Sequence, residues 1–512
     1  MTPQQAGPTI GNPVPPASLV VDTVVVTTGQ LPAVVFEGPG AAPEHFLLQA
    51  SRQVLPAELI ALGNRWSARV PLLVSNWNGP VLPARSGRYT VVASAADGSR
   101  MPLQQPAELP APQLLPSVTR VTVTSSEGSL VVALSAPLTD RERGRLQQAS
   151  LESDYRVTDY EPLNAVFFES FYGQNASCNP LAIDRALARL QPQVARYWSV
   201  ADASVAVPEG STALLEGSAE WWRIRGSVRL LVVNDWLRKR FRKRRYQTVL
   251  QTWHGTMLKK IALSRRGLGI RSAIATLRER GRWDILLAQN PYSRGVFRSA
   301  YAFTGSVWEE GYPRDDVLLT GDAANIRSRL GIPTGVTVLL YAPTWRDDRP
   351  DHVDHLDVAR FAGLLGDGYV TLIRGHSRTL QPGEDVHASN VLDVTGYPDV
   401  SELFLVADAL ITDYSSVMFD FTITGKPVFF FAPDLEHYRQ KLRGFYFDLI
   451  PVAPGPVITT VEELTALVRD RDTVQQQFAE KYRAWRERFN PRDDGHAADR
   501  VVKRLLAEGI ID

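Results

Sequence analysis

The chain has 512 residues, which is too long for one ordinary hydrophobic core, so two or three domains are expected. Hydrophobic residues make up 44% and charged residues 22%, as in soluble globular proteins, and a net charge of +1 requires any basic partner-binding surface to be local. The single cysteine, Cys178, excludes an intramolecular disulfide, and no run approaches the ~18 apolar residues that cross a bilayer. These features and an N-terminus unlike a signal peptide predict a cytoplasmic protein, soluble or peripheral.

The first part of the chain is expected to contain no active site. Residues 1–17 are rich in Pro, Gly and Gln and predict a disordered tail. Residues 18–145 hold short β-branched runs such as "SLVVDTVVVTTG" and "GRYTVVASAADG", cut by turn residues, which predict an antiparallel β-sandwich-like domain. Nothing in this region has catalytic spacing, so we expect a role in interaction or scaffolding.

From residue 160 onwards, apolar strand-like runs alternate with helical segments. Residues 160–325 contain "NAVFFESF", "RLLVVNDW" and "DILLAQ", and residues 326–512 contain "TVLLYAPTW", "YVTLIRGH" and "PVFFFAP". This alternation predicts two parallel sheets covered by helices, that is, twin Rossmann-like domains facing a cleft. No GxGxxG or Walker lysine motif follows these strands, which disfavours a dinucleotide oxidoreductase or a P-loop enzyme.

The segment "WLRKRFRKRRYQ" is basic at every position from 238 to 245 except Phe241. A solvated face is the ordinary interpretation of such a run. The interleaved Trp236, Phe241 and Tyr246 favour contact with an anionic membrane surface or a polyanionic acceptor, whereas no module typical of nucleic-acid binding accompanies the run. The predicted contact residues are Arg238, Lys239, Arg240, Arg242, Lys243, Lys259 and Lys260.

His254 follows the apolar run "TVLQ" and is the candidate general base. Ligands of open α/β sheets bind beyond the carboxyl ends of strands, and an imidazole can accept a hydroxyl proton near neutral pH. Gly255 allows a ligand to approach the backbone, and Thr256 is expected to start a helix that carries Lys259 and Lys260. A structural histidine is the alternative when this stretch is taken alone.

Three more strand ends carry groups that suit phosphate, and the first is Ala342-Pro343-Thr344-Trp345-Arg346 after "VLLY". Arg374 and His376 lie two residues apart, so their side chains share a face, and an arginine fork matches phosphate geometry. In "ALITDYSSVMFD", Asp413 or Ser415 is expected to cap a helix whose free amides bind an anion, and Asp420 is expected to reach a ligand hydroxyl. Plain helix capping and a buried histidine are the alternatives.

No cluster has the spacing of metal ligands. His352 and His355 lie among aspartates in "RPDHVDHLD", where a solvated loop is expected rather than a metal site. Cys178 has no evident catalytic partner. The sequence therefore predicts neither a metal nor a required cofactor.

Taken together, the motifs resemble those of the CDP-glycerol glycerophosphotransferase family, the teichoic acid polymerases and primases. The matching elements include "QTWHGTMLKKIA", "GYPRDDVL", "YAPTWRDD", "IRGHS", "ADALITDYSSVMFDF" and "RGFYFD", in the order of the family, while residues 18–145 have no such match. The resemblance implies a GT-B-type fold with an acceptor-side domain at 160–325 and a nucleotide donor-binding domain at 326–512. It also implies CDP-glycerol as donor substrate, a lipid-linked or polymeric acceptor, and a peripheral location on the inner membrane face.

The resemblance also implies residue roles. His254 matches the general base, and His376, with Arg374, matches the basic strand end that contacts the donor pyrophosphate. The other implied donor-binding residues are Trp253, Gly255, Thr256, Arg314, Pro343, Thr344, Ser415, Ser416 and Asp420. Met257 and Ser377 depart from residues common in the family, which leaves glycerol and ribitol both open as the polyol. A nucleotide-sugar glycosyltransferase of GT-B type and a non-catalytic envelope scaffold are the alternatives.

Overall fold

The computed structural model describes residues 18–344, 356–375, 390–435 and 444–512. The chain divides into two compact units, one formed by residues 1–74 and 83–135 and the other by residues 75–82 and 136–512. The predicted tail at 1–17, His352, His355 and His376 lie outside the described residues.

The first unit contains two antiparallel sheets that share one core. The six-stranded sheet has the order β12-β13-β14-β10-β4-β5 and the four-stranded sheet the order β2-β3-β7-β6. Apolar residues alternate along their strands, and Phe36, Leu48 and Trp66 are buried in the common core. The strands are β1 (Leu19–Val20), β2 (Thr23–Thr27), β3 (Ala33–Pro39), β4 (His45–Ala50), β5 (Gln53–Pro56), β6 (Glu58–Leu62), β7 (Arg65–Pro71), β10 (Gly87–Ser94), β11 (Leu103–Gln104), β12 (Gln113–Leu115), β13 (Thr119–Ser126) and β14 (Ser129–Ser135). The short strands β8 (Leu73–Ser75) and β9 (Val81–Pro83) pair with each other and extend into residues 75–82, which belong to the second unit.

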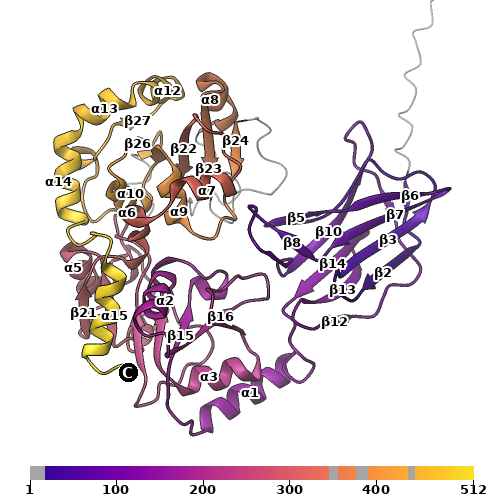
Figure 1. Cartoon of the computed structure of the whole chain (residues 1–512), viewed down its shortest axis with the longest axis horizontal. Helices are drawn as coiled ribbons and strands as arrows, with labels where there is room; N and C mark the ends of the chain where they lie inside the picture. The colour runs from indigo at the N-terminus through magenta and orange to yellow at the C-terminus, as the bar shows by residue number, and fades with distance from the viewer. Residues whose placement is uncertain (1–17, 345–355, 376–389, 436–443) are drawn as a thin grey trace, which may run out of the picture. The chain divides into compact units, whose positions relative to one another are not determined.

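The second unit begins with a seven-stranded parallel sheet of order β17-β16-β15-β18-β19-β20-β21. Its strands are continuous apolar runs such as "VRLLVV", because both faces are covered by helices (Figure 1). Its strands are β15 (Leu163–Glu169), β16 (Ala195–Val200), β17 (Thr212–Leu215), β18 (Val228–Val233), β19 (Thr248–Gln251), β20 (Ile285–Ala288) and β21 (Ser306–Glu309). Its helices are α1 (Arg145–Val157), α2 (Cys178–Leu190), α3 (Ala219–Ser227), α4 (Ile270–Arg280) and α5 (Pro291–Ala300), with short 3-10 helices η1 (Phe171–Gly173), η2 (Ala262–Ser264) and η3 (Pro313–Asp315).

A second parallel sheet follows, of order β24-β23-β22-β25-β26-β27. Its strands are β22 (Thr337–Ala342), β23 (Tyr369–Ile373), β24 (Val391–Asp393), β25 (Ala409–Thr412), β26 (Val428–Phe431) and β27 (Val457–Ile458). Its helices are α6 (Val317–Thr320), α7 (Ala323–Arg329), α8 (Val358–Leu365), α9 (Val400–Val406), α10 (Val417–Phe421), α12 (Val461–Arg469), α13 (Arg471–Gln477) and α14 (Ala479–Phe489), with η4 (Thr422–Thr424) and η5 (Ile450–Val452).

The last two helices connect the two parallel sheets. Trp485 and Phe489 of α14 pack into the core of the second sheet. Helix α15 (Ala497–Ala507) returns to the first sheet, where Val501 and Leu505 are buried and the helix lies beside α2 (Figure 1). The sheets are therefore parts of one compact unit.

In both parallel sheets, successive strands are added first on one side of the first strand and then on its other side. The change of side falls between β15 and β18 in the first sheet and between β22 and β25 in the second. Loops that leave neighbouring strands in opposite directions open a crevice at such a point, which is where ligands of open α/β sheets bind. A ligand site is therefore expected at these two positions.

Candidate functional site

His254 lies at the switch point of the first sheet, three residues beyond β19. Its Nδ1 donates a hydrogen bond of 2.6 Å to the carbonyl oxygen of Asn234, which follows β18. Because a carbonyl can only accept, Nδ1 carries the proton and Nε2 of the neutral ring holds a free electron pair. Burial lowers the pKa of His254, although the nearby Asp235 carboxylate raises it. The ring is therefore a neutral proton acceptor near pH 7.

Two aromatic rings hold the imidazole of His254 in place. Trp253 stacks on it with ring centres 5.0 Å apart, and Phe171 meets it edge-on at 5.6 Å. Phe171 and Trp253, which pack on this ring, have left-handed backbone conformations, as do Tyr172, the next residue after Phe171, and Cys178, whose Sγ contacts Arg314. Such conformations cost on the order of 1–3 kcal/mol each and concentrate at functional sites. The strain around His254 is consistent with a site rather than with ordinary core packing.

Gly255 brings the loop of His254 against the second sheet. A Cβ atom at this position would lie 3.0 Å from Oγ and 3.1 Å from Cβ of Ser416. Its φ of +154° is also one that residues with side chains rarely adopt. The predicted close approach at Gly255 is thus an approach to Ser416 in the structure. It places the end of β19 next to the loop after β25.

Arg314 joins the two sheets behind His254. Its Nη1 donates to the carbonyl oxygen of His254 at 2.9 Å and contacts Sγ of Cys178 at 3.4 Å, and its Nη2 pairs with the Asp420 carboxylate. Burial opposes the charge of Arg314, but Asp420 raises its pKa well above the ordinary value. Arg314 therefore remains charged and connects η3 of the first sheet to α10 of the second.

A buried carboxyl cluster surrounds this ion pair. Gln289 Nε2 lies 3.1 Å from Asp315, 3.1 Å from Asp420 and 3.0 Å from Asp493. Burial raises the pKa of all three carboxyls, well above the ordinary value for Asp315 and to about 7 for Asp493. One arginine cannot neutralise three buried carboxylates, so the cluster holds protons at neutral pH.

The switch point of the second sheet holds the loops after β22 and β25. The amide N–H of Thr344 donates to both oxygens of Asp413, at 2.9 and 3.0 Å. The predicted capping of α10 by Asp413 or Ser415 is wrong, because Ser416 is the N-cap residue and no side chain makes a capping hydrogen bond. The carboxylate of Asp413 instead ties the Pro343–Thr344 loop to β25.

Arg374 leaves β23 at the same edge of the second sheet. Its Nη1 donates to the carbonyl oxygens of Tyr397 at 2.8 Å and Val394 at 3.3 Å, and burial lowers its pKa to about 10.

A cavity of about 420 Å³ has walls from both parts of the unit, with Arg185 of α2 and Arg314 of η3 on one side and Asp399, which caps α9, on the other. This volume suits a small-molecule ligand.

Three predicted donor-binding side chains are instead engaged inside the protein. Trp253 is buried against Phe297 and Tyr301, Thr256 bonds Gln289 and Asn290, and Asp420 pairs with Arg314. No helix begins at Thr256, so the expected helix carrying Lys259 and Lys260 is absent, and the next α-helix is α4. The backbone of the loop instead pairs with residues 444–446: the N–H of Lys260 donates to the carbonyl of Gly444 at 3.1 Å, and the carbonyl of Leu258 accepts from the N–H of Tyr446 at 2.8 Å.

The basic segment lies between β18 and β19 and differs from the prediction in one respect. Its aromatic side chains turn inward: Trp236 and Phe241 pack against the core, and the hydroxyl of Tyr246 donates to the carbonyl of Gly226 at 2.8 Å. The basic side chains are exposed, apart from the half-buried Arg244. The alternation of basic and aromatic residues suggested that the rings point outward. They point inward because the buried Arg225 donates to carbonyl oxygens of the segment and its guanidinium packs on the ring of Phe241.

Several residues of this site were not predicted from the sequence. Asn234 orients His254, Gln289 gathers the carboxyl cluster, and Phe171 and Tyr172 form the turn after β15. Asn234 and Gln289 follow directly on apolar strands, in "VVND" and "LLAQN", and Phe171 and Tyr172 lie two and three residues beyond β15. Applying the strand-end rule to every strand would have found them.

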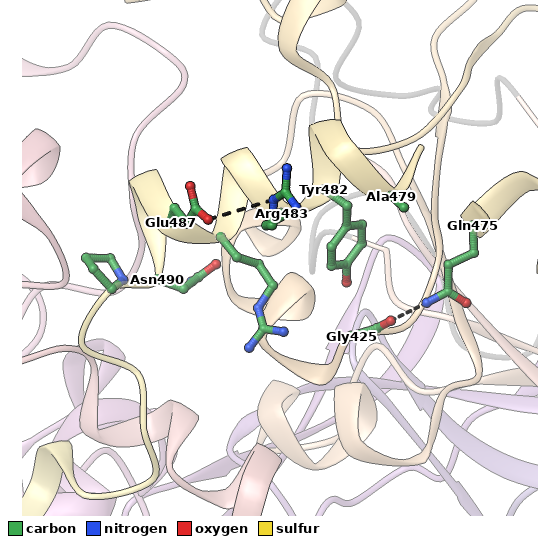
Figure 2. Close-up of a pocket in the computed structure, with 9 residues that line it drawn as sticks. Gly425, Gln475, Ala479, Tyr482, Arg483, Glu487 and Asn490 are labelled. Atoms are coloured by element: carbon green, nitrogen blue, oxygen red, sulfur yellow. Dashed lines mark hydrogen bonds and ion pairs between the residues drawn. The ribbon is translucent and has the colours of Figure 1, made fainter. Parts of the chain in front are cut away.

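A further cavity lies away from these residues. It measures about 510 Å³ and lies beside α14, where Figure 2 shows Tyr482 and Gln475 near Gly425. The Gln475 amide bonds the Gly425 carbonyl, and Arg483 pairs with Glu487 at 3.9 Å (Figure 2). None of the predicted site residues lines it.

The described ranges contain no cluster of three or more side chains suited to a metal ion. Over the same ranges, none of the helices combines the length and the apolar character that a membrane span needs.

Comparison with known proteins identifies relatives of the second unit. Residues 154–507 match the family described as CDP-Glycerol:Poly(glycerophosphate) glycerophosphotransferase. The chain is 34% identical over 390 residues to the teichoic acid poly(glycerol phosphate) polymerase of Bacillus subtilis (strain 168), covering 71% of this chain and 52% of that protein. It is 33% identical over 387 residues to the teichoic acid glycerol-phosphate transferase of Staphylococcus aureus (strain NCTC 8325 / PS 47), covering 71% and 98%.

Solved structures agree with this result. The wall teichoic acid polymerase TagF superposes with a TM-score of 0.66 at 35% identity, over 71% of this chain and 94% of that chain. The predicted family and the predicted GT-B-like α/β fold are confirmed. The chain spans about half the length of the first polymerase relatives that it matches.

Proposed function

Since the chain belongs to the CDP-glycerol:poly(glycerophosphate) glycerophosphotransferase family, we propose that it transfers glycerol phosphate from CDP-glycerol to a hydroxyl of a teichoic-acid-like acceptor, with release of CMP. Relatives are named as poly(glycerol phosphate) polymerases and a glycerol-phosphate transferase, and a TagF variant has been soaked with CDPG. Ribitol-phosphate enzymes match over shorter stretches, 32% to 52% of the chain. Glycerol is therefore the favoured polyol.

The observation that carries the proposal is the protonation state and the position of the His254 ring. Its Nδ1 proton is committed to Asn234, burial keeps the ring neutral, and Gly255 sets the loop against Ser416 of the other sheet. A base at one switch point thus faces the phosphate-binding residues expected at the other. This is the arrangement that transfer between two substrates requires.

In the proposed reaction, Nε2 of His254 takes the proton of the acceptor hydroxyl. The acceptor oxygen forms a bond to the phosphorus that bears the glycerol, and the bond from that phosphorus to the CMP oxygen breaks. The partly exposed Ser415 and Ser416 and the guanidinium of Arg374 would hold the charge that builds on the leaving phosphate. The role of His376 in the same contact stays a prediction.

Other predicted residues are assigned to positioning. Arg314 binds the backbone of His254 and the carboxylate of Asp420, so it fixes the base relative to α10. Trp253 and Thr256 are buried and hold the same loop. Pro343 and Thr344 shape the donor side through the contact of Thr344 with Asp413. These residues act on the donor through the residues that touch it.

We assign the sheet-bearing parts to separate tasks. Residues 160–325 contribute the base and would hold the acceptor, and residues 326–512 would hold CDP-glycerol. Residues 18–145, which lie outside the family match, would form a sandwich-like domain for interaction or scaffolding.

We also propose peripheral binding to the anionic inner face of the cell membrane, with α4 as the contact. Ile270, Ile274 and Leu277 of α4 are 80%, 43% and 40% exposed and lie at i, i+4 and i+7, on one helix face. The exposed basic residues beside this face are Arg265, Arg266, Arg271 and Arg278. An apolar stripe edged by arginines fits the boundary between acidic headgroups and acyl chains. Lys259 and Lys260 lie close to α4 in sequence.

The test is release of CMP from CDP-glycerol, and separately from CDP-ribitol, with a lipid-linked acceptor mixture. We expect wild type to release CMP from CDP-glycerol and His254→Ala to lose the activity by a factor of about 10² or more. The matched control is His45→Ala in the first unit, an exposed histidine that should leave the rate unchanged. Turnover of UDP-sugars without release of CMP would contradict the proposal and favour a glycosyltransferase.

A further inference from the structure

A strained turn of the second unit lies in residues 75–82, which precede the family match. The turn connects β8 to β9, and the N–H of Gly79 donates to the carbonyl of Asn76 at 2.9 Å. The two residues between them, Trp77 and Asn78, have φ of 58° and 49°. A β-turn with positive φ at both central residues normally holds Gly, Asn or Asp there. A tryptophan in this conformation is strained, and such strain indicates that its ring has a task.

The two strained residues contact one pair of side chains beside the second parallel sheet. The Trp77 ring packs against the core of that sheet and meets the ring of the buried Tyr397 edge-on, with ring centres 5.8 Å apart. Nδ2 of Asn78 donates to the carbonyl of Arg329 at 3.0 Å. Nη2 of Arg329 in turn donates to the hydroxyl of Tyr397 at 3.0 Å, and that hydroxyl donates to the Glu402 carboxylate. The turn therefore helps to fix the position of the Tyr397 ring.

Tyr397 also orients Arg374 through its backbone. Its carbonyl accepts from Nη1 of Arg374 at 2.8 Å, and the carbonyl of Val394 accepts from the same nitrogen at 3.3 Å. The N–H of Tyr397 donates to the carbonyl of Val394 at 3.0 Å, which closes the turn that presents both acceptors. Because the ring and the carbonyl belong to one residue, a movement of the Tyr397 ring moves the acceptors that hold the guanidinium.

From these contacts we propose that Trp77 is a positioning residue for Arg374. Packed on Tyr397, it fixes the two carbonyls that aim the guanidinium at the phosphates of CDP-glycerol. The inference rests on the proposed function, in which Arg374 holds charge on the leaving phosphate. It gives a role at the donor site to a residue outside the family match at 154–507. Glycine or asparagine at position 77 would form the turn with less strain, but neither would supply the ring.

The experiment measures initial rates of CMP release from CDP-glycerol, with the lipid-linked acceptor mixture, for wild type, Trp77→Gly and Trp77→Phe. Glycine accepts a positive φ without strain, so Trp77→Gly removes the ring and keeps the turn. Trp77→Phe keeps an aromatic ring that can pack against Tyr397. The matched control is Glu127→Gly, which replaces an exposed residue with φ of 51° in the turn between β13 and β14.

For Trp77→Gly we expect the KM of CDP-glycerol to rise about threefold to tenfold, while the apparent KM of the acceptor stays unchanged. Trp77→Phe should recover most of this loss, and Glu127→Gly should behave as wild type. In an Arg374→Gln background, Trp77→Gly should raise the KM of CDP-glycerol by less than about twofold, because the guanidinium through which Trp77 acts is then missing.

The same fold rise with and without Arg374 would overturn the inference, because Trp77 would then act on the stability of the sheet and not on the guanidinium. An equal rise in the KM of donor and acceptor, or wild-type behaviour of Trp77→Gly, would overturn it as well. Absence of CMP release by wild type would instead count against the proposed function.

Discussion

Replacing Gly255 with alanine tests whether contact between the two sheets positions the base. The new Cβ would lie 3.0 Å from Oγ and 3.1 Å from Cβ of Ser416, and 3.6 Å from Nη2 of Arg314. Overpacking of this kind costs about 1–3 kcal/mol, and the backbone strain of a side chain at φ +154° adds about 1–2 kcal/mol. We therefore expect Gly255→Ala to lower the free energy of unfolding of the second unit by about 2–5 kcal/mol.

The assay is urea unfolding of the full chain, followed by tryptophan fluorescence, in a double-mutant cycle with Ser416→Gly. Removing the Ser416 side chain removes both short contacts, so Gly255→Ala should cost about 1–3 kcal/mol less in the Ser416→Gly background. Gly267→Ala serves as control, since Gly267 also has a positive φ, +67°, but a Cβ added there would meet no atom within 4 Å. An equal cost of Gly255→Ala in both backgrounds would refute the reasoning, because the strain would then be confined to the backbone.

Two further predictions concern pH and membranes. Burial raises the pKa of Asp493 from 3.8 to about 7, so between pH 4 and pH 7 the native state binds more protons than the unfolded state. The free energy of unfolding should therefore fall by up to about 4 kcal/mol as pH rises from 4 to 7. Denaturant unfolding at pH 5 and pH 8 would measure this, and a rise in stability over that range would contradict the buried protonated cluster. Ile274→Asp in α4 should weaken binding to vesicles rich in phosphatidylglycerol by about tenfold, measured by sedimentation. Ser272→Asp on the same helix is the control, because it adds the same negative charge without removing an apolar side chain. Equal effects of the two substitutions would remove α4 as an apolar contact.

Much of the site could be predicted from short stretches of sequence. Buried parallel strands are long apolar runs, and the rule that ligands lie beyond their carboxyl ends led to His254, Arg374 and Ser415 directly. Strands β16, β17, β21, β24 and β27 were missed, and four of them have only two to four residues, too few for a pattern, while the six-residue β16 reads "ARYWSV" and mixes polar with apolar residues. None of these omissions affected the site, because none of the five strands borders the switch point of its sheet.

The errors arose where distant residues decide the outcome. A helix after Thr256 is locally reasonable, but the Thr256 hydroxyl bonds Gln289, 33 residues later. Outward aromatic residues in the basic segment are equally reasonable, but the buried Arg225 of α3 draws Phe241 inward. A local pattern cannot report a partner that the fold brings in from another element.

The sequence by itself determined the alternation of strands and helices, the family, and the residue types that could do the chemistry. Only the tertiary structure decided which nitrogen of His254 is free, because that depends on a carbonyl 20 residues away. The tertiary structure alone also brings Asp315, Asp420 and Asp493 to the side-chain amide of Gln289, from positions up to 178 residues apart (493 minus 315). The physical reason is that periodicity depends on near neighbours along the chain, whereas protonation and charge pairing depend on near neighbours in space.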